Sequence, residues 1–303
     1  MDLDEPIVLS SVGMNGVFLS GGGARGAYEV GVLKTLLSEG PPISIIGGTS
    51  VGALNAILAA TGQLDELTEV WNHLSTLKIW RPRLDVWNLH KWHSLTSTSG
   101  LKKRLKDRVH WAKIAHSRIQ VFISATNISL KKSETFSNAD ITYRHVMASS
   151  AIPLLFPPVR IGKYWYVDGA FSLLRPLKPI LKAGAERIFT VFLSPRRPRI
   201  KNISNLFDLS DRVLEVILSS AITQDRAQIE NTNAEIERLK SSNIDPALFQ
   251  HKPYRPVEIV AIYPSRDLGT VTSYIRFSGS KAKELIELGM SDCYQVLQRK
   301  GLV

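Results

Sequence analysis

The sequence predicts an α/β domain of three layers, in which helices cover both faces of a mainly parallel central sheet. Two consecutive units carry this prediction, because each reads as a short apolar strand, a glycine-rich turn and an apolar helix. The chain has 303 residues, 44% of them hydrophobic, which is enough to bury a sizeable core. We expect one domain over residues 1–303, with both glycine turns at the carboxyl edge of the sheet, where ligands bind in such folds.

The first unit comprises a strand at Val17–Leu19, a glycine turn and a helix that ends before Gly40 and Pro41. The second comprises a strand at Ile43–Ile46, a turn at Gly47–Gly52 and a helix at Val51–Ala60. Further strands are predicted at 119–125, 165–167, 188–193 and 257–262. A long amphipathic helix over 209–240 and a last helix over 281–298 predict a largely helical C-terminal part at about 205–303.

A basic segment rich in tryptophan is predicted as an insertion of helices and loops at about 63–118. The chain has a formal charge of +11, and between Lys78 and Arg118 eleven Lys or Arg face only two Asp. Basic residues interleaved with Trp suit an anionic membrane surface, since the charges attract lipid phosphates and indoles lodge at headgroup depth. The residues predicted to make this contact are Trp80, Trp87, Trp92, Lys102, Lys103 and Arg104. The alternatives are a solvated basic face over buried tryptophans, or nucleic acid, which we do not expect as a partner.

The cellular location is predicted from three features that the sequence lacks: a spanning helix, a secretory signal and a pair of cysteines. No stretch approaches the roughly 18 to 20 apolar residues of a spanning helix. The first residues carry Asp2, Asp4 and Glu5 where a secretory signal carries Lys or Arg. The single Cys293 cannot form an internal disulfide. We expect a cytoplasmic protein that can attach peripherally to a membrane.

The second glycine turn has the pattern of a nucleophile elbow. Gly48-Thr49-Ser50-Val51-Gly52 fits G-x-S-x-G between a strand and a helix. Ser50 would sit on a strained turn, and the two flanking glycines, Gly48 and Gly52, would remove Cβ atoms that otherwise clash there. The alternative interpretation is a common glycine turn with a serine N-cap.

The first glycine turn can bind an anion. In Gly21-Gly22-Gly23-Ala24-Arg25, three residues without side chains let successive amides converge on one point before a helix N-terminus. A phosphate loop would end in Lys and Ser or Thr, which are absent here. A dinucleotide fold would have an acidic residue at the end of the second strand, which is also absent. An oxyanion hole that serves Ser50 is therefore favoured.

The serine requires a base, for which histidine is a weak candidate. Beyond residue 145 the only histidine is His251, in a Pro-rich stretch, and the histidines have no metal-ligand spacing. Asp168 instead follows an apolar strand and precedes Gly169, at a turn that permits close approach. A carboxylate in an apolar site has a raised pKa and is a better base than in water. The alternative is an ordinary Asp-Gly turn.

Four motifs taken together resemble the patatin-like phospholipase family, over about residues 16–171. They are Ser20–Gly26, Gly48–Gly52, Ala148–Pro153 with Phe156-Pro157-Pro158, and Asp168-Gly169, in that order along the chain. The resemblance implies a patatin-like fold and acyl hydrolysis by a Ser–Asp dyad, without histidine, metal or other cofactor. It implies Ser50 as nucleophile, Asp168 as base, the backbone of Gly21, Gly22 and Gly23 as oxyanion hole, and Arg25 as support for that loop. Many members have Asp at the position of Ser20 and a second glycine at that of Ala170.

The expected function is a lipid acyl hydrolase of the phospholipase A or lysophospholipase type, which forms an acyl-enzyme on Ser50. Its substrate would be a phospholipid or another acyl-ester lipid. Two alternatives remain open. One is a soluble carboxylesterase of short acyl esters, and the other is a non-catalytic binding or regulatory protein that uses the basic segment. The sequence does not predict an oligomeric state.

Overall fold

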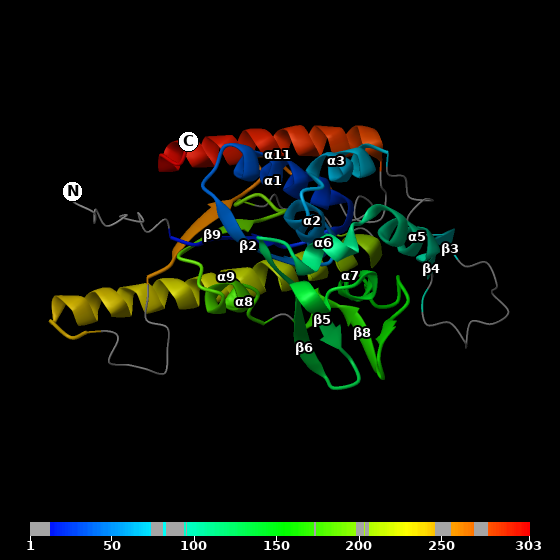
Figure 1. Cartoon of the computed structure of the whole chain (residues 1–303), viewed down its shortest axis with the longest axis horizontal. Coiled ribbons are helices and arrows are strands. Elements are labelled where there is room, and N and C mark those ends of the chain that lie inside the picture. The colour runs from blue at the N-terminus through cyan, green and yellow to red at the C-terminus, as the bar shows by residue number, and fades with distance from the viewer. Residues whose placement is uncertain are drawn as a thin grey trace, which may run out of the picture.

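The central element of the fold is an eight-stranded mixed sheet with helices on both faces, as Figure 1 shows for this computed structural model. The structure describes residues 13–73, 81–82, 94, 96–172, 174–197, 203, 206–245, 256–269 and 278–303. The strand order is β10-β9-β1-β2-β5-β8-β7, and β6 also pairs with β5. The mutually parallel strands are β1 (Asn15–Leu19), β2 (Ile43–Thr49), β5 (Gln120–Asn127), β9 (Arg187–Val191) and β10 (Glu258–Ile262). The predicted three-layer α/β fold with a mainly parallel sheet is confirmed.

Three antiparallel strands complete the sheet around β5. They are β6 (Lys132–Ser137), β7 (Val159–Ile161) and β8 (Tyr164–Asp168). Strand β6 pairs along the far side of β5, and the other two continue on the side of β2, past its end. The sequence analysis predicted the apolar core of β8 but neither β6 nor β7, because these two strands are largely solvent-facing and lack an apolar run. Because β8 runs antiparallel to β5, its last residue, Asp168, pairs with Ala125, directly past the position where the last residue of β2 pairs with Ser124.

Each face of the sheet has its own apolar core. In Figure 1, α1 (Ala27–Ser38), α3 (Leu64–Asn72) and α11 (Gly279–Lys300) lie above the sheet, and α8 (Lys178–Lys182) and α9 (Leu206–Ser241) lie below it. Strand alternation supplies both cores. Val17 and Leu19 of β1 pack toward the upper helices with α2 (Val51–Ala60), whereas Phe18 packs toward Ile222 and Ile229 of α9.

The predicted insertion at about 63–118 is only partly separate from the fold: α3 packs in the upper helical layer with α1, α2 and α11, whereas α5 (Ser99–Arg108) lies beside α7 (Tyr143–Ser149). The insertion contains α5 and α6 (Trp111–Ala115), as expected, but also a short ribbon of β3 (Arg81–Pro82) and β4 (Thr96–Ser97). The expectation of helices and loops alone was wrong here, because two-residue strands carry no alternation to detect. No helix in the described parts of the chain is long and apolar enough to cross a bilayer.

The tryptophan-rich part of the insertion is described only in part. Trp80, Trp87 and Trp92 lie outside the described residues. Trp111 is half-buried against the upper core, and its indole donates a 2.8 Å hydrogen bond to the Leu105 carbonyl. Trp111 is therefore a packing residue.

Candidate active site

Ser50 occupies the strained turn between β2 and α2. Its φ of 56° and ψ of −129° lie in a region that non-glycine residues rarely adopt. A Cβ on Gly48 would lie 2.3 Å from the Gly52 carbonyl oxygen, and one on Gly52 would lie 2.6 Å from the Leu19 carbonyl oxygen. The chain can close this tightly only because both flanking residues are glycines, as the G-x-S-x-G pattern predicted.

The Ser50 side chain lies close enough to the Asp168 carboxylate to lower its pKa as a hydrogen-bond donor. The sheet register explains this contact, since Thr49 pairs with Ser124 of β5 and the next residue of β5, Ala125, pairs with Asp168. Strand β6 occupies the other side of β5, so Thr49 and Asp168 lie at consecutive positions along the same side of β5, where the end of β2 meets the end of β8. Ser50 occupies the N-cap position of α2, but its side chain makes no capping hydrogen bond to that helix.

Asp168 is a buried carboxylate with few stabilising partners. Its side chain is almost fully enclosed, with 2% of the residue exposed. Burial raises its pKa to about 7, against the opposing effects of hydrogen bonds from the Ala170 amide, at 2.9 Å, and from Ser50. Gly169 allows the turn to approach β5, since a Cβ there would lie 2.3 Å from the Ser124 carbonyl oxygen. This pKa suits a general base that works near neutral pH.

Ser149 links the elbow to β5, a role that the sequence analysis missed. Its hydroxyl accepts a 3.0 Å hydrogen bond from the Ser50 amide and donates a 2.7 Å hydrogen bond to the Ser124 carbonyl. Ser149 is fully buried at the end of α7. The stretch Ala148–Pro153 was one of the four motifs, but its spacing gave no clue to this contact.

The glycine loop lies against the elbow. Gly21, Gly22 and Gly23 have φ values of 72°, 157° and 57°, and a Cβ on Gly21 would lie 2.9 Å from the Ser50 Cβ. The Gly21 amide, however, donates a 2.9 Å hydrogen bond to a carboxylate oxygen of Glu29. The backbone donor of Gly21 is thus engaged inside the protein, which leaves the Gly22 and Gly23 amides as the candidate oxyanion donors of the three. Arg25 is buried in the same loop.

Glu29 anchors this loop through a buried polar network. Its second oxygen accepts a 2.9 Å hydrogen bond from the Asn55 amide, which also donates to the Gly26 carbonyl at 3.0 Å. The Trp71 indole donates to the Asn55 carbonyl oxygen at 3.1 Å. Burial raises the pKa of Glu29 to about 7. The available signal was Asn55, the one polar residue of the otherwise apolar α2, and a glutamate in the apolar first turns of α1.

The remaining candidates are distributed as follows. Lys102 and Lys103 are exposed on α5, with Arg104 half-buried beside them. His251 lies outside the described residues. Among the residues that the structure describes, no group of three His, Cys, Asp or Glu side chains could hold a metal ion.

A strained serine after β2, a glycine loop after β1 and a buried carboxylate at the end of β8 define a serine and carboxylate site on an α/β fold. The profile of the family described as Patatin-like phospholipase matches residues 17–181, and the chain belongs to this family. Lysophospholipase nte1 of Aspergillus terreus is 30% identical over 181 residues, which cover 58% of this chain and 12% of that protein. Lysophospholipase NTE1 of Saccharomyces cerevisiae is 28% identical over 188 residues, which cover 58% of this chain and 10% of that protein. The chain thus spans only a small part of these relatives.

Among solved structures, VipD from Legionella pneumophila aligns with a TM-score of 0.45 at 13% identity. The alignment covers 95% of this chain and 67% of that chain. The type III effector protein ExoU aligns with a TM-score of 0.42, also at 13% identity, over 95% of this chain and 53% of that chain.

Proposed function

We propose that this protein hydrolyses fatty acyl esters of phospholipids or lysophospholipids, with Ser50 as nucleophile and Asp168 as base. The observation that carries the proposal is the placement of the strained Ser50 beside the buried Asp168 carboxylate, at consecutive positions along β5. Burial raises the pKa of this carboxylate to about 7, against the opposing effect of the Ser50 side chain. Family membership and the lysophospholipase relatives support the choice of lipid esters.

Each step of the reaction has a group in the site. Asp168 takes the proton of the Ser50 hydroxyl as its oxygen attacks the ester carbonyl carbon. The amides of Gly22 and Gly23 stabilise the oxyanion of the tetrahedral intermediate. Asp168 then protonates the leaving alcohol, and an acyl-enzyme remains. Water attacks the acyl carbon while Asp168 accepts its proton, and the fatty acid leaves as Ser50 regains its hydrogen.

Exposed apolar side chains near Asp168 favour a lipid over a small polar ester. Leu154 and Leu174 are each 79% exposed, and Phe171 is 42% exposed. The segment that carries Leu154 contacts Asp168 directly, because the Ala151 carbonyl accepts a 2.9 Å hydrogen bond from the Asp168 amide. Large exposed apolar side chains that gather around a site are typical of surfaces that meet lipid or protein.

The exposed basic face of α5 is proposed to contact anionic lipid headgroups. Lys102 and Lys103 project from this helix next to the half-buried Arg104. Each Lys or Arg near an anionic surface contributes about 1 kcal/mol to membrane attraction. The face would hold the enzyme at the bilayer while acyl chains reach the site.

A labelling experiment combined with lipid analysis tests the catalytic proposal. A fluorophosphonate probe should label the native protein and not the Ser50→Ala variant. Mass spectrometry should detect free fatty acids released from phospholipid or lysophospholipid vesicles by the native protein but not by Asp168→Asn. Labelling without lipid turnover, but with turnover of short esters, would favour the soluble carboxylesterase. A folded native protein without labelling would favour the non-catalytic alternative.

A further inference from the structure

Strand β10 forms an edge of the sheet within the described residues. Its parallel pairing with β9 uses alternate residues, since the Glu258 amide donates to the Glu186 carbonyl and the Ile262 carbonyl accepts from the Phe192 amide. The N–H and C=O groups of Glu258, Val260 and Ile262 therefore face β9. Those of Ile259 and Ala261 face away from it.

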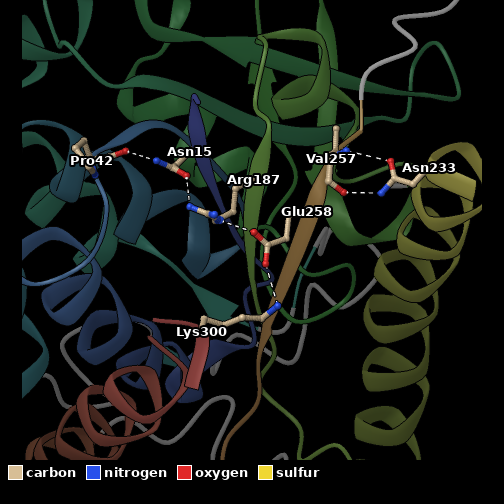
Figure 2. A network of polar contacts seen from close by, with 7 residues as sticks. All are labelled: Asn15, Pro42, Arg187, Asn233, Val257, Glu258 and Lys300. Carbon is tan, nitrogen blue, oxygen red and sulfur yellow. Dashed lines mark hydrogen bonds and ion pairs between the residues drawn. The ribbon is translucent and has the colours of Figure 1, made fainter. Parts of the chain in front are cut away.

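At the amino end of this outer edge, the side-chain amide of Asn233 makes the two backbone hydrogen bonds that a neighbouring strand would make. The Asn233 amide of α9 donates to the Val257 carbonyl at 2.8 Å and accepts from the Val257 amide at 3.0 Å, as Figure 2 shows. Val257 is one alternation before Ile259. No described strand pairs with the next two outward-facing residues, Ile259 and Ala261, so the edge opens beyond Val257.

The open edge lines a groove of about 1080 Å³ between α9 and α11. Its walls are strongly basic, since one acidic residue, Asp292, lines it beside five cationic ones. The cationic residues are Arg196 and Arg197 after β9, Arg226 on α9, and Arg299 and Lys300 on α11. Asp292 is already engaged, because its carboxylate accepts hydrogen bonds from the Tyr28 hydroxyl at 3.2 Å and the Ser265 amide at 2.9 Å.

Ion pairs anchor the edge strand to the wall of the groove. The Glu258 carboxylate accepts from Arg187 of β9 at 2.7 Å and from Lys300 of α11 at 2.9 Å, as Figure 2 shows. Arg226 pairs with Glu230 at 2.7 Å within α9. Arg196 and Arg197 are exposed, and neither belongs to an ion pair that the structure describes. The groove therefore keeps its basic character near the carboxyl end of β10.

We propose that this groove, which we call the edge groove, binds an extended acidic peptide segment of a partner protein as an additional strand on β10. The backbone of Ile259 and Ala261 would pair with the segment, and the arginines would contact its carboxylates. Lys and Arg beside an edge strand can also merely prevent unwanted pairing. A recessed groove that contains both unpaired backbone groups and a surplus of cations favours a specific acidic strand.

A phosphate ligand would use the same cations but not the same backbone groups. It would contact the arginine side chains and have no use for alternate N–H and C=O groups along a strand. Pairing of the Ile259 and Ala261 backbone with the ligand therefore distinguishes the two ligands. The edge groove is separate from the candidate active site, because β9 and β1 lie between β10 and the strand that leads to Ser50.

Fluorescence anisotropy with defined peptides tests the proposal. The probe is an eight-residue labelled peptide that alternates valine and glutamate, and its matched control alternates valine and lysine. We expect saturable binding of the acidic peptide only. A variant of this peptide with an N-methyl group on every backbone amide has the same charge but no N–H group left to pair as a strand, and should bind at least about tenfold more weakly.

Protein variants test the same contacts from the other side. Ala261→Pro removes the outward N–H while leaving the pairing with β9 intact, and should weaken binding about tenfold relative to Ala261→Ser. Arg197→Glu should weaken it by a similar factor. Equal affinity for the N-methylated and unmodified peptides would overturn the proposal, even if Ala261→Pro failed to fold. So would failure of the acidic peptide to bind, with or without tight binding of inositol hexakisphosphate.

Discussion

The Gly21 amide and the Glu29 carboxylate are joined by a 2.9 Å hydrogen bond that ties the glycine loop to the first turn of α1. Glu29 has no exposed surface, and its other oxygen is held by Asn55 of α2, the helix that Ser50 precedes. The same carboxylate therefore touches the two segments that must face each other in the site. Its loss should alter the loop and the elbow together.

Replacing Glu29 with alanine should leave two buried donors, the Gly21 amide and the Asn55 amide, without their acceptor. Each such group costs about 1–3 kcal/mol, so Glu29→Ala should lower the free energy of unfolding and kcat together. Glu29→Gln keeps an acceptor for Gly21 and should lose less of both. Urea unfolding and turnover of a short ester measure the two effects, and an equal loss in both variants would contradict this role.

Activity should rise with pH through about 7, because Asp168 must be ionised to accept the proton and burial raises its pKa to about 7. The kcat/KM of a short ester between pH 5 and 9 measures this limb. Glu29 has its pKa raised to a similar value, so the limb should persist in Glu29→Gln. If kcat/KM of Glu29→Gln no longer rose with pH through about 7, the rise would be due to ionisation of Glu29 instead of Asp168.

Stability should fall as pH rises from about 4 to about 7. Unfolded Asp168 ionises near its usual pKa of about 4, so between these values the folded state holds the extra proton. In this window ionisation of the unfolded chain favours the unfolded state, and above about pH 7, where Asp168 is ionised in both states, no further stability is lost. Urea unfolding at pH 5 and pH 8 should show a smaller difference for Asp168→Asn than for the native protein. An unchanged difference would mean that Asp168 does not titrate in this range.

Gly21→Ala should be far more harmful than Gly62→Ala. The two glycines have nearly equal φ values of 72° and 71°, but a Cβ on Gly21 would lie 2.2 Å from the Thr49 carbonyl oxygen, whereas nothing lies within 4 Å at Gly62. Gly62→Ala should cost about 1–2 kcal/mol from the left-handed backbone alone. Thermal unfolding and fluorophosphonate labelling should show a larger stability loss and weaker labelling for Gly21→Ala only.

Ser149→Ala should slow catalysis by changing the position of the Ser50 elbow, not by removing a contact with the substrate. It removes the acceptor of the Ser50 amide and the donor to the Ser124 carbonyl, so the elbow loses its link to β5. We expect a loss of about 1–3 kcal/mol in stability and a fall in kcat, with Ser150→Ala as the neighbouring control. A variant with native kcat would exclude a positioning role for Ser149.

Much of the fold could be predicted because its elements have strong local patterns. The observed elements match the predicted apolar strands and glycine turns up to Ser50 closely. They also match the two long helices α9 and α11, which were predicted from apolar residues at helical spacing. Strands β6 and β7 could not be predicted, since their residues face solvent and their pairing is decided by partners distant in sequence. The β3–β4 ribbon was missed because each of its strands has only two residues.

Within the site, local sequence determined which residues can bend sharply, expose a hydroxyl or carry a buried charge, because backbone strain and side-chain chemistry belong to single residues. It thereby selected Ser50, Asp168 and the glycines around them. Only the tertiary structure decided which amides remain available, since the pairing of Gly21 with Glu29 and of Ser50 with Ser149 depends on contacts across 8 and 99 residues. Such contacts arise when distant elements pack, and no periodicity along the chain encodes them.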